Sequence, residues 1–345
     1  MKQTLFLLVC AAALLSSCSK DETLQSGNDR GIDFRAAMAT RATETTTASL
    51  NSFFTTAIDN SGANYFTDVE FTKSGSYFTS SPAYYWPSDG SALTFYAYAP
   101  SASDLGATVT INNGTKQLVN YTPATDISDQ LDFITTTATG SKANETTGVA
   151  LTFEHRLSQI EIKAKNTNDA YVFKVQGVKI GQPVSKATFD FGTNAWALGA
   201  DKADYTVEYT TDRTLNATAV SLMATTDDNA MLIPQQLTAW DPDTDGGNTA
   251  KGAYIAVKVN ITTKDGARVY PDAAKGTYGW AAVAINTQWE AGKKYVYTLD
   301  FSNGAGRVDP DDPDHAGETI MGSPIKFTVT VNPWQEATPA PDITM

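Results

Sequence analysis

The chain has 345 residues, enough for one large domain or two ordinary ones that each bury a core. Its 25 Lys and Arg residues, against 38 Asp and Glu residues, give a formal charge of −13. This charge, without clusters of basic residues, argues against a nucleic-acid partner, because neutralisation of phosphates dominates that affinity. It argues equally against electrostatic attraction to an anionic membrane, so attachment to a membrane would need an anchor.

Residues 1–17 are typical of a signal peptide, with Lys2 before an apolar run, Leu5 to Leu15, that is too short to span a bilayer. The sequence Leu15-Ser-Ser-Cys18 resembles the bacterial lipobox, which implies that the Cys18 thiol is acylated and begins the mature chain. Ser19-Lys-Asp-Glu22 resembles the export signal of Bacteroidetes surface lipoproteins. The resemblance implies a lipid-anchored protein on the outer face of the outer membrane. The alternative is an ordinary secretory signal that happens to contain a cysteine.

The chain contains two cysteines, Cys10 and Cys18. The first would leave with the signal and the second would carry lipid, so the mature chain is expected to lack disulfides, cysteine nucleophiles and cysteine-based metal sites. Residues 18–30 are polar and are predicted to form a flexible tether.

Residues 31–40 are predicted to form the first strand. Ile32, Phe34 and Met38 fall on one side of an alternating pattern, which is typical of a strand with one buried face. A Thr-rich stretch containing Arg41 follows. Two further strands are expected within 50–71, separated by a turn with the sequence Asn-Ser-Gly.

The stretch 84–100 is the most distinctive part of the expected mature chain. Tyr84, Tyr85 and Trp86 precede a turn and an alternating segment with bulky residues on both faces. One interpretation is an aromatic platform that binds sugar. We favour the other, a central strand covered on both faces, because aromatic residues are common core material in all-β folds.

His155 lies on the same face of an alternating segment as Phe153 and Leu157. It could be a catalytic residue or a metal ligand. We favour a core imidazole bonded to backbone, because no second His or Cys is available nearby to complete a site.

Four segments, in order along the chain, resemble the fimbrillin family of Bacteroidales, the subunits of type V pili. They are the Ile32-x-Phe34 strand with Thr40-Arg-Ala42, the aromatic stretch 84–100, the segment 151–160, and the closing Val331-Asn-Pro-Trp334. The resemblance implies an all-β chain with two consecutive transthyretin-like β-sandwich domains, and a role as an adhesive pilus component. It also implies partners: other fimbrial subunits in a homo- or heteropolymer, the outer membrane through the lipid, and a host or bacterial surface ligand.

Alternating segments and turn signals continue through the second half, as expected for sandwiches, and long helical periodicity is absent. A polar break at Asn166 to Asp169 is the predicted boundary between an N-terminal domain, 31–168, and a C-terminal domain, 169–345.

Two acidic loops are candidate cation sites. Asp241, Asp243 and Asp245 copy the start of a calcium loop, but Gly252 stands where the bidentate Glu is expected. A solvated loop is therefore favoured there, and also at 309–314, where neighbouring carboxylates without a cation would repel each other. No catalytic residue, metal or cofactor is predicted, because none of the many acidic pairs stands out by its context.

The fimbrillin resemblance also implies a maturation step, in which an Arg-specific protease removes the lipid and the strand that carries Ile32, Phe34 and Met38. A neighbouring subunit would fill the groove that this leaves. Arg41 is the preferred cleavage site, because it follows the strand and enters a stretch that is expected to be exposed. Cleavage at Arg30 would leave the strand in place, and Arg35 lies within it.

The C-terminal segment contains a further strand with one apolar face. It either closes its own domain or complements a neighbour by strand addition. Its apolar residues are Ile325, Phe327, Val329 and Val331. The favoured function is thus a fimbrial subunit on the cell surface, and the alternative is a surface glycan-binding lipoprotein with exposed aromatic residues.

Overall fold

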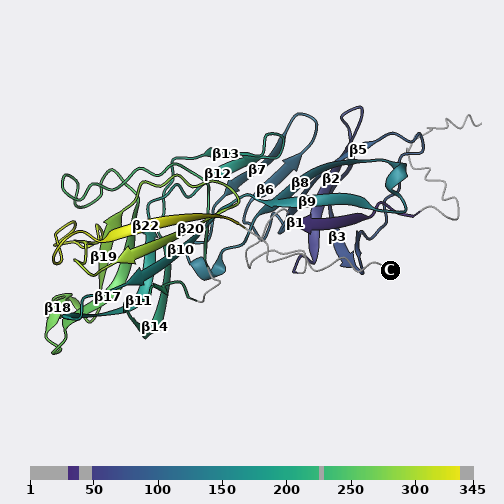
Figure 1. Cartoon of the computed structure of the whole chain (residues 1–345). Helices are drawn as coiled ribbons and strands as arrows, with labels where there is room; N and C mark the ends of the chain where they lie inside the picture. Colours follow the sequence, from purple (N-terminus) through teal and green to yellow (C-terminus); the bar gives the residue numbers. More distant parts are fainter. Residues whose placement is uncertain (1–29, 39–48, 225–228, 335–345) are drawn as a thin grey trace, which may run out of the picture.

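The computed structural model describes residues 30–38, 49–224 and 229–334. In these residues the chain forms 22 strands and three short 3-10 helices, Ile127–Asp129, Lys142–Asn144 and Ala273–Lys275. The prediction of an all-β fold with little helix is confirmed. Within the described ranges, no helix has the length and apolar character needed to cross a membrane. Figure 1 shows an elongated molecule with the first strands at one end and many of the later strands at the other.

Seven strands from the first half of the chain form one sheet. They are β1 (Phe34–Met38), β2 (Ser52–Asp59), β3 (Asn64–Ser74), β4 (Tyr77–Thr79), β5 (Leu93–Ala99), β8 (Ile134–Gly140) and β9 (Val149–His155). Their order is β1-β4-β3-β2-β5-β8-β9, and β9 pairs back to β1, so the sheet closes into a barrel. This differs from the open sheets of a simple sandwich, and the cause is β1, which pairs with β9 along one edge and with β4 at one position on the other.

Strand β5 explains why the aromatic stretch has bulk on both faces. Leu93 and Phe95 point into the core of the barrel. Tyr98, from the other face, belongs to a second core with Phe133 and Phe191. The interpretation of this segment as a strand covered on both sides therefore holds.

Two further sheets share one large core, whose residues include Ile162 on one sheet and Val257 on the other. This pair of sheets has the sandwich architecture that the sequence predicts. The first has the order β15-β10-β20-β22, with β16 beside β10, and the second has the order β14-β11-β17-β19-β21, with β18 beside β17. The first contains β10 (Ser158–Lys165), β15 (Val220–Ser221), β16 (Ala230–Leu232), β20 (Lys293–Asp300) and β22 (Lys326–Pro333). The second contains β11 (Tyr171–Gly181), β14 (Tyr205–Thr214), β17 (Tyr254–Thr263), β18 (Arg268–Tyr270), β19 (Gly279–Ala284) and β21 (Arg307–Val308).

A four-stranded sheet joins segments from both halves of the chain (Figure 1). It contains β6 (Thr108–Ile111), β7 (Lys116–Tyr121), β12 (Ala187–Asp190) and β13 (Ala195–Leu198), in the order β13-β12-β7-β6. Strand β12 therefore pairs with β7 across the predicted boundary at 168/169. Strand β10, which precedes that boundary, pairs in parallel with β20. The division into domains 31–168 and 169–345 stays a prediction.

The first testable consequence concerns Phe34. Phe34→Ala should lower the free energy of unfolding by about 3–5 kcal/mol, because it removes an aromatic ring that is completely buried. Arg35→Ala is the matched control on the same strand, where the side chain is exposed, and should change that free energy by less than about 0.5 kcal/mol. Chemical denaturation followed by intrinsic fluorescence measures both. Equal stabilities would mean that β1 contributes nothing to the core.

Candidate functional site

Strand β1 is held unequally along its two edges. It pairs in parallel with β9 over five positions, from Phe34 opposite Val149 to Met38 opposite Phe153. Towards β4 it has a single paired position, Phe34 opposite Phe78. One edge is thus bonded along its whole length and the other is bonded at one point.

The backbone just before β1 is also tied to the barrel. The N–H of Ile32 donates to the carbonyl of Tyr84 at 2.6 Å, and the N–H of Val149 donates to the carbonyl of Asp33 at 2.9 Å. The predicted strand 31–40 thus begins later, at Phe34, although Ile32 is already buried. Residues 39 and 40 lie outside the described residues.

The apolar side chains of this segment fill the centre of the barrel. The ring of Phe34 makes edge-to-face contacts with Phe53, Phe71 and Phe95, at centroid distances of 5.7, 4.7 and 5.0 Å. Ile32 and Met38 are buried in the same core. Burial of the three side chains contributes roughly 5–9 kcal/mol, at about 1.5–3 kcal/mol each, and this is an upper estimate because the unfolded chain is partly compact.

Two of the three candidate arginines are described. Arg30 is exposed, with its guanidinium 3.6 Å from the Asp33 carboxylate and 5.6 Å from the centroid of the Tyr77 ring. Burial raises the pKa of Asp33 above its usual range, and the Arg30 charge opposes that shift. Arg35 has an exposed side chain, but its residue pairs with Ala150 in the sheet. Arg41 and the candidate lipid site Cys18 lie outside the described residues.

The C-terminal strand β22 is docked at the edge of its sheet. It pairs antiparallel with β20 over eight positions, from Lys326 opposite Asp300 to Pro333 opposite Lys293. Of its predicted apolar face, Ile325 is buried, and Phe327 and Val329 are half-buried against the sandwich core. The last residue of that face, Val331, is 52% exposed, so the apolar face is only partly covered. The reason is that the far end of this edge strand does not pack against the sandwich core.

Trp334 fastens the end of β22 to β9. Its indole is completely buried and stacks on the imidazole of His155, with ring centroids 4.1 Å apart and planes at 8°. The backbone N–H of Trp334 donates to the backbone carbonyl of Gly292 at 3.0 Å. The Nδ1 atom of His155 lies 2.8 Å from a carboxylate oxygen of Asp132, and both side chains are buried. His155 is a core residue, as expected, and a carboxylate is one of its partners.

The two candidate segments therefore meet on one strand. Residues 149–153 of β9 hold β1, and His155, two residues further along, holds Trp334. Sequence reasoning missed this contact. The indication in the sequence was the alternating pattern, which placed His155 on an apolar face. That pattern cannot say which ring covers the face.

Two of the three side chains of the aromatic platform proposed as an alternative, Tyr84 and Trp86, pack in the core of the barrel. Trp86 is buried, and its indole makes an edge-to-face contact with the ring of Phe95 at 5.9 Å. Tyr84 is half-buried and packs against Phe66, with ring centroids 4.8 Å apart. These residues support the core of the barrel.

The carboxylates of the candidate calcium loop are bound by groups of the protein itself. Asp241 accepts a hydrogen bond from the Thr244 hydroxyl, Asp245 accepts one from the backbone N–H of Ala250, and Asp243 pairs with Arg307. These bonds hold the pKa values of Asp241 and Asp245 below their usual range. Among residues 30–38, 49–224 and 229–334, no group of three or more His, Cys, Asp or Glu side chains could hold a metal ion.

Comparison with known proteins gives consistent results. Residues 40–334 match the model of the fimbrillin-like family. The fimbrium subunit Fim1C of Phocaeicola vulgatus is 26% identical over 311 residues, which cover 75% of this chain and 82% of that protein. The crystal structure of a fimbrial protein from Bacteroides vulgatus has the same fold, with a TM-score of 0.59 and 17% identity, and covers 88% of this chain and 99% of that one.

The stack on His155 yields a second prediction. Trp334→Ala should lower the free energy of unfolding by about 3–5 kcal/mol and expose β22 to proteases, because it removes the buried ring at the end of the strand. Val331→Ala is the control on the same strand, since its side chain is largely exposed, and should change the free energy by less than about 0.5 kcal/mol. Denaturation and limited proteolysis with C-terminal mass spectrometry report both effects. A Trp334→Ala variant as resistant as the control would contradict the anchoring role.

Proposed function

This chain belongs to the fimbrillin-like family, and on that premise we propose that it is a structural and adhesive subunit of a cell-surface fimbria. The proposal has two finer parts. The chain is exported as a lipoprotein anchored in the outer membrane, and it assembles with other fimbrial subunits by strand complementation. The proposal includes no catalytic activity and no cofactor.

The position of β1 is the observation that carries the proposal. Loss of β1 would leave a groove between β4 and β9, with one backbone edge of β9 unpaired and the rings of Phe53, Phe71 and Phe95 uncovered. Such an open edge and apolar floor are what an added strand recognises. The burial lost with β1, roughly 5–9 kcal/mol, is comparable with the whole stability of a domain, about 5–15 kcal/mol. A neighbour's strand that restores this burial would bind tightly without another source of energy.

The segment Ile325 to Val331 is the proposed donor. Its apolar residues alternate, as a donor strand requires, and among the described residues its strand is bonded along one edge only. Val331 already lies largely outside the core of its own sandwich. In the competing arrangement this strand remains with β20 and closes its own domain, and another subunit supplies the donor.

The lipid anchor has a direct test. If Cys18 is acylated, the mature protein should partition into the detergent phase, and the Cys18→Ala variant should be soluble in the periplasm. Phase separation of cell extracts, followed by immunoblotting, measures the distribution. Unchanged partitioning of Cys18→Ala would remove the lipoprotein part of the proposal and leave the fimbrial role intact.

Cleavage at Arg41 is the fourth prediction. N-terminal sequencing of protein sheared from the cell surface should give chains that begin at Ala42, and Arg41→Ala should abolish both those chains and their polymers. Arg35→Ala is the matched control and should leave cleavage and polymerisation unchanged. The purified chain should polymerise after treatment with an Arg-specific protease and remain monomeric without it. Surface chains that begin only at Cys18 would identify an uncut subunit. Chains that begin at Gly31 would retain β1, which would contradict the proposal that cleavage opens a groove.

A further inference from the structure

A cavity of about 510 Å³ lies on the sandwich, beside β18 and β19 and against the loop that runs from 309 to 320. This volume is within the range of about 300–1,000 Å³ that is usual for sites that bind small ligands. Figure 1 shows β18 and β19 at the end of the molecule away from β1, so the cavity is separate from the proposed assembly groove.

A lysine held between two carboxylates lines this cavity. The Nζ atom of Lys179, on β11, lies 2.7 Å from a carboxylate oxygen of Asp309 and 2.7 Å from one of Asp311. The side chains of Lys179 and Asp309 are only 8% and 4% exposed. The sequence predicted a solvated loop here, and that prediction is wrong at Asp309, because a lysine 130 residues earlier supplies the cation that the loop itself lacks.

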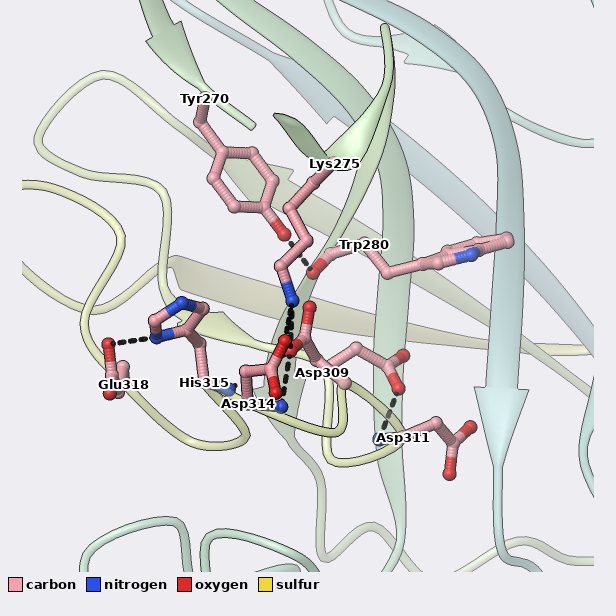
Figure 2. Close-up of polar contacts among 9 residues, drawn as sticks. Tyr270, Lys275, Trp280, Asp309, Asp311, Asp314, His315 and Glu318 are labelled. Atoms are coloured by element: carbon pink, nitrogen blue, oxygen red, sulfur yellow. Dashed lines mark hydrogen bonds and ion pairs between the residues drawn. The ribbon is translucent and has the colours of Figure 1, made fainter. Parts of the chain in front are cut away.

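The walls are also held in place before any ligand arrives. The hydroxyl of Tyr270 donates to the carbonyl of Trp280 at 2.9 Å. Lys275, which lines the cavity, pairs with Asp314 and lies 3.4 Å from Asp312. Figure 2 shows the side chains of Tyr270 and Lys275 extending from one wall towards Asp309 and Asp314 on the loop opposite. A site with its side chains already ordered loses less entropy when a ligand binds.

The chemistry of the lining is mixed. Half-buried aromatic rings provide apolar surface, and they come from Tyr270, Tyr278 and Trp280. Asp311 and Glu318 have side chains that are 63% and 62% exposed, and they offer acceptors, whereas the Lys275 ammonium offers donors. Alternating donors and acceptors beside apolar rings match a sugar, whose hydroxyl groups both donate and accept and whose ring carbons form an apolar face.

The charge of the lining limits the class of sugar. The lining contains five carboxylates and two ammonium groups, which leaves an excess of negative charge. That excess repels phosphate, sulfate and carboxylate groups. The carboxylates belong to Asp272, Asp309, Asp311, Asp312 and Glu318, and the ammonium groups to Lys179 and Lys275.

We propose that this cavity binds a neutral carbohydrate, such as the terminal hexose of a surface glycan. The site goes beyond assembly of a fimbria, because it gives the assembled subunit a ligand of its own. It is also a glycan-binding role, as in the alternative considered from the sequence, but at a different place from Tyr84 to Trp86. The contacts with the sugar come from the exposed carboxylates and Lys275, and the aromatic rings pack against its apolar face.

The test uses the purified chain without its predicted signal peptide. The ligands are a panel of neutral disaccharides: lactose, maltose, cellobiose and N,N′-diacetylchitobiose. Saturation-transfer NMR and isothermal titration calorimetry should detect millimolar or tighter binding of at least one of them. Asp311→Asn and Glu318→Gln should each weaken that binding about tenfold, which is the usual cost of losing one hydrogen bond to a charged group. Both side chains are exposed, so the variants are expected to fold.

Two comparisons make the result decisive. Tyr65→Ala removes an exposed tyrosine from β3 in the barrel and should leave sugar binding unchanged. A sialylated or sulfated version of the bound sugar should bind more weakly than the neutral one. The proposal is overturned if no neutral sugar in the panel binds at millimolar concentration, if both cavity variants bind as the unmodified chain does, or if the cavity takes up a cationic probe such as spermidine in place of sugar. Because the assay uses monomer, each of these outcomes leaves the assembly proposal untouched.

Discussion

The closure of the barrel depends on five residues, Phe34–Met38, which pair with β9 on one side and with β4 on the other. The other six strands, in the order β4-β3-β2-β5-β8-β9, would form an open sheet, and β1 closes it through hydrogen bonds and the insertion of Phe34 among aromatic rings. Parallel pairing with β9 fixes its register, and burial of Ile32, Phe34 and Met38 supplies its stability. The first strand of the described chain is thus the one that completes the core of the barrel.

Strand β9 connects this arrangement to the C-terminus. Its side chains alternate between the barrel and solvent, which places Val149, Leu151 and Phe153 inside and leaves His155 at the last inward position. There the imidazole has an indole on one face and a carboxylate at one nitrogen. A disturbance of β9 therefore reaches both terminal segments, because one strand supplies the backbone that pairs with β1 and the ring that holds Trp334.

Period-two alternation made much of this predictable. It identified Ile32, Phe34 and Met38 as buried, and it favoured a core role for the 84–100 stretch and for His155. It could not identify partners, because alternation states which face is apolar and not which strand lies beside it. Closure of the barrel, the stack of Trp334 on His155 and the pair of Lys179 with Asp309 all join residues distant in sequence. The exposure of Val331 shows a related limit of alternation: an apolar residue in a strand is buried only where a core extends beneath it.

The separation of β1 and β22 determines the symmetry of any polymer built by exchanging strands between copies of this subunit. The groove left by β1 and the segment Ile325 to Val331 are different surfaces of the chain, so one copy would contribute its groove and the next its strand. Contacts of this head-to-tail kind are heterologous and lack the two-fold axis that terminates growth at a dimer. Unless the rotation between successive copies closes a ring, they extend into a polar filament with two chemically distinct ends. One end would then present an unfilled groove and the other an unused strand. A subunit or a cap would therefore recognise a different surface at each end of the filament.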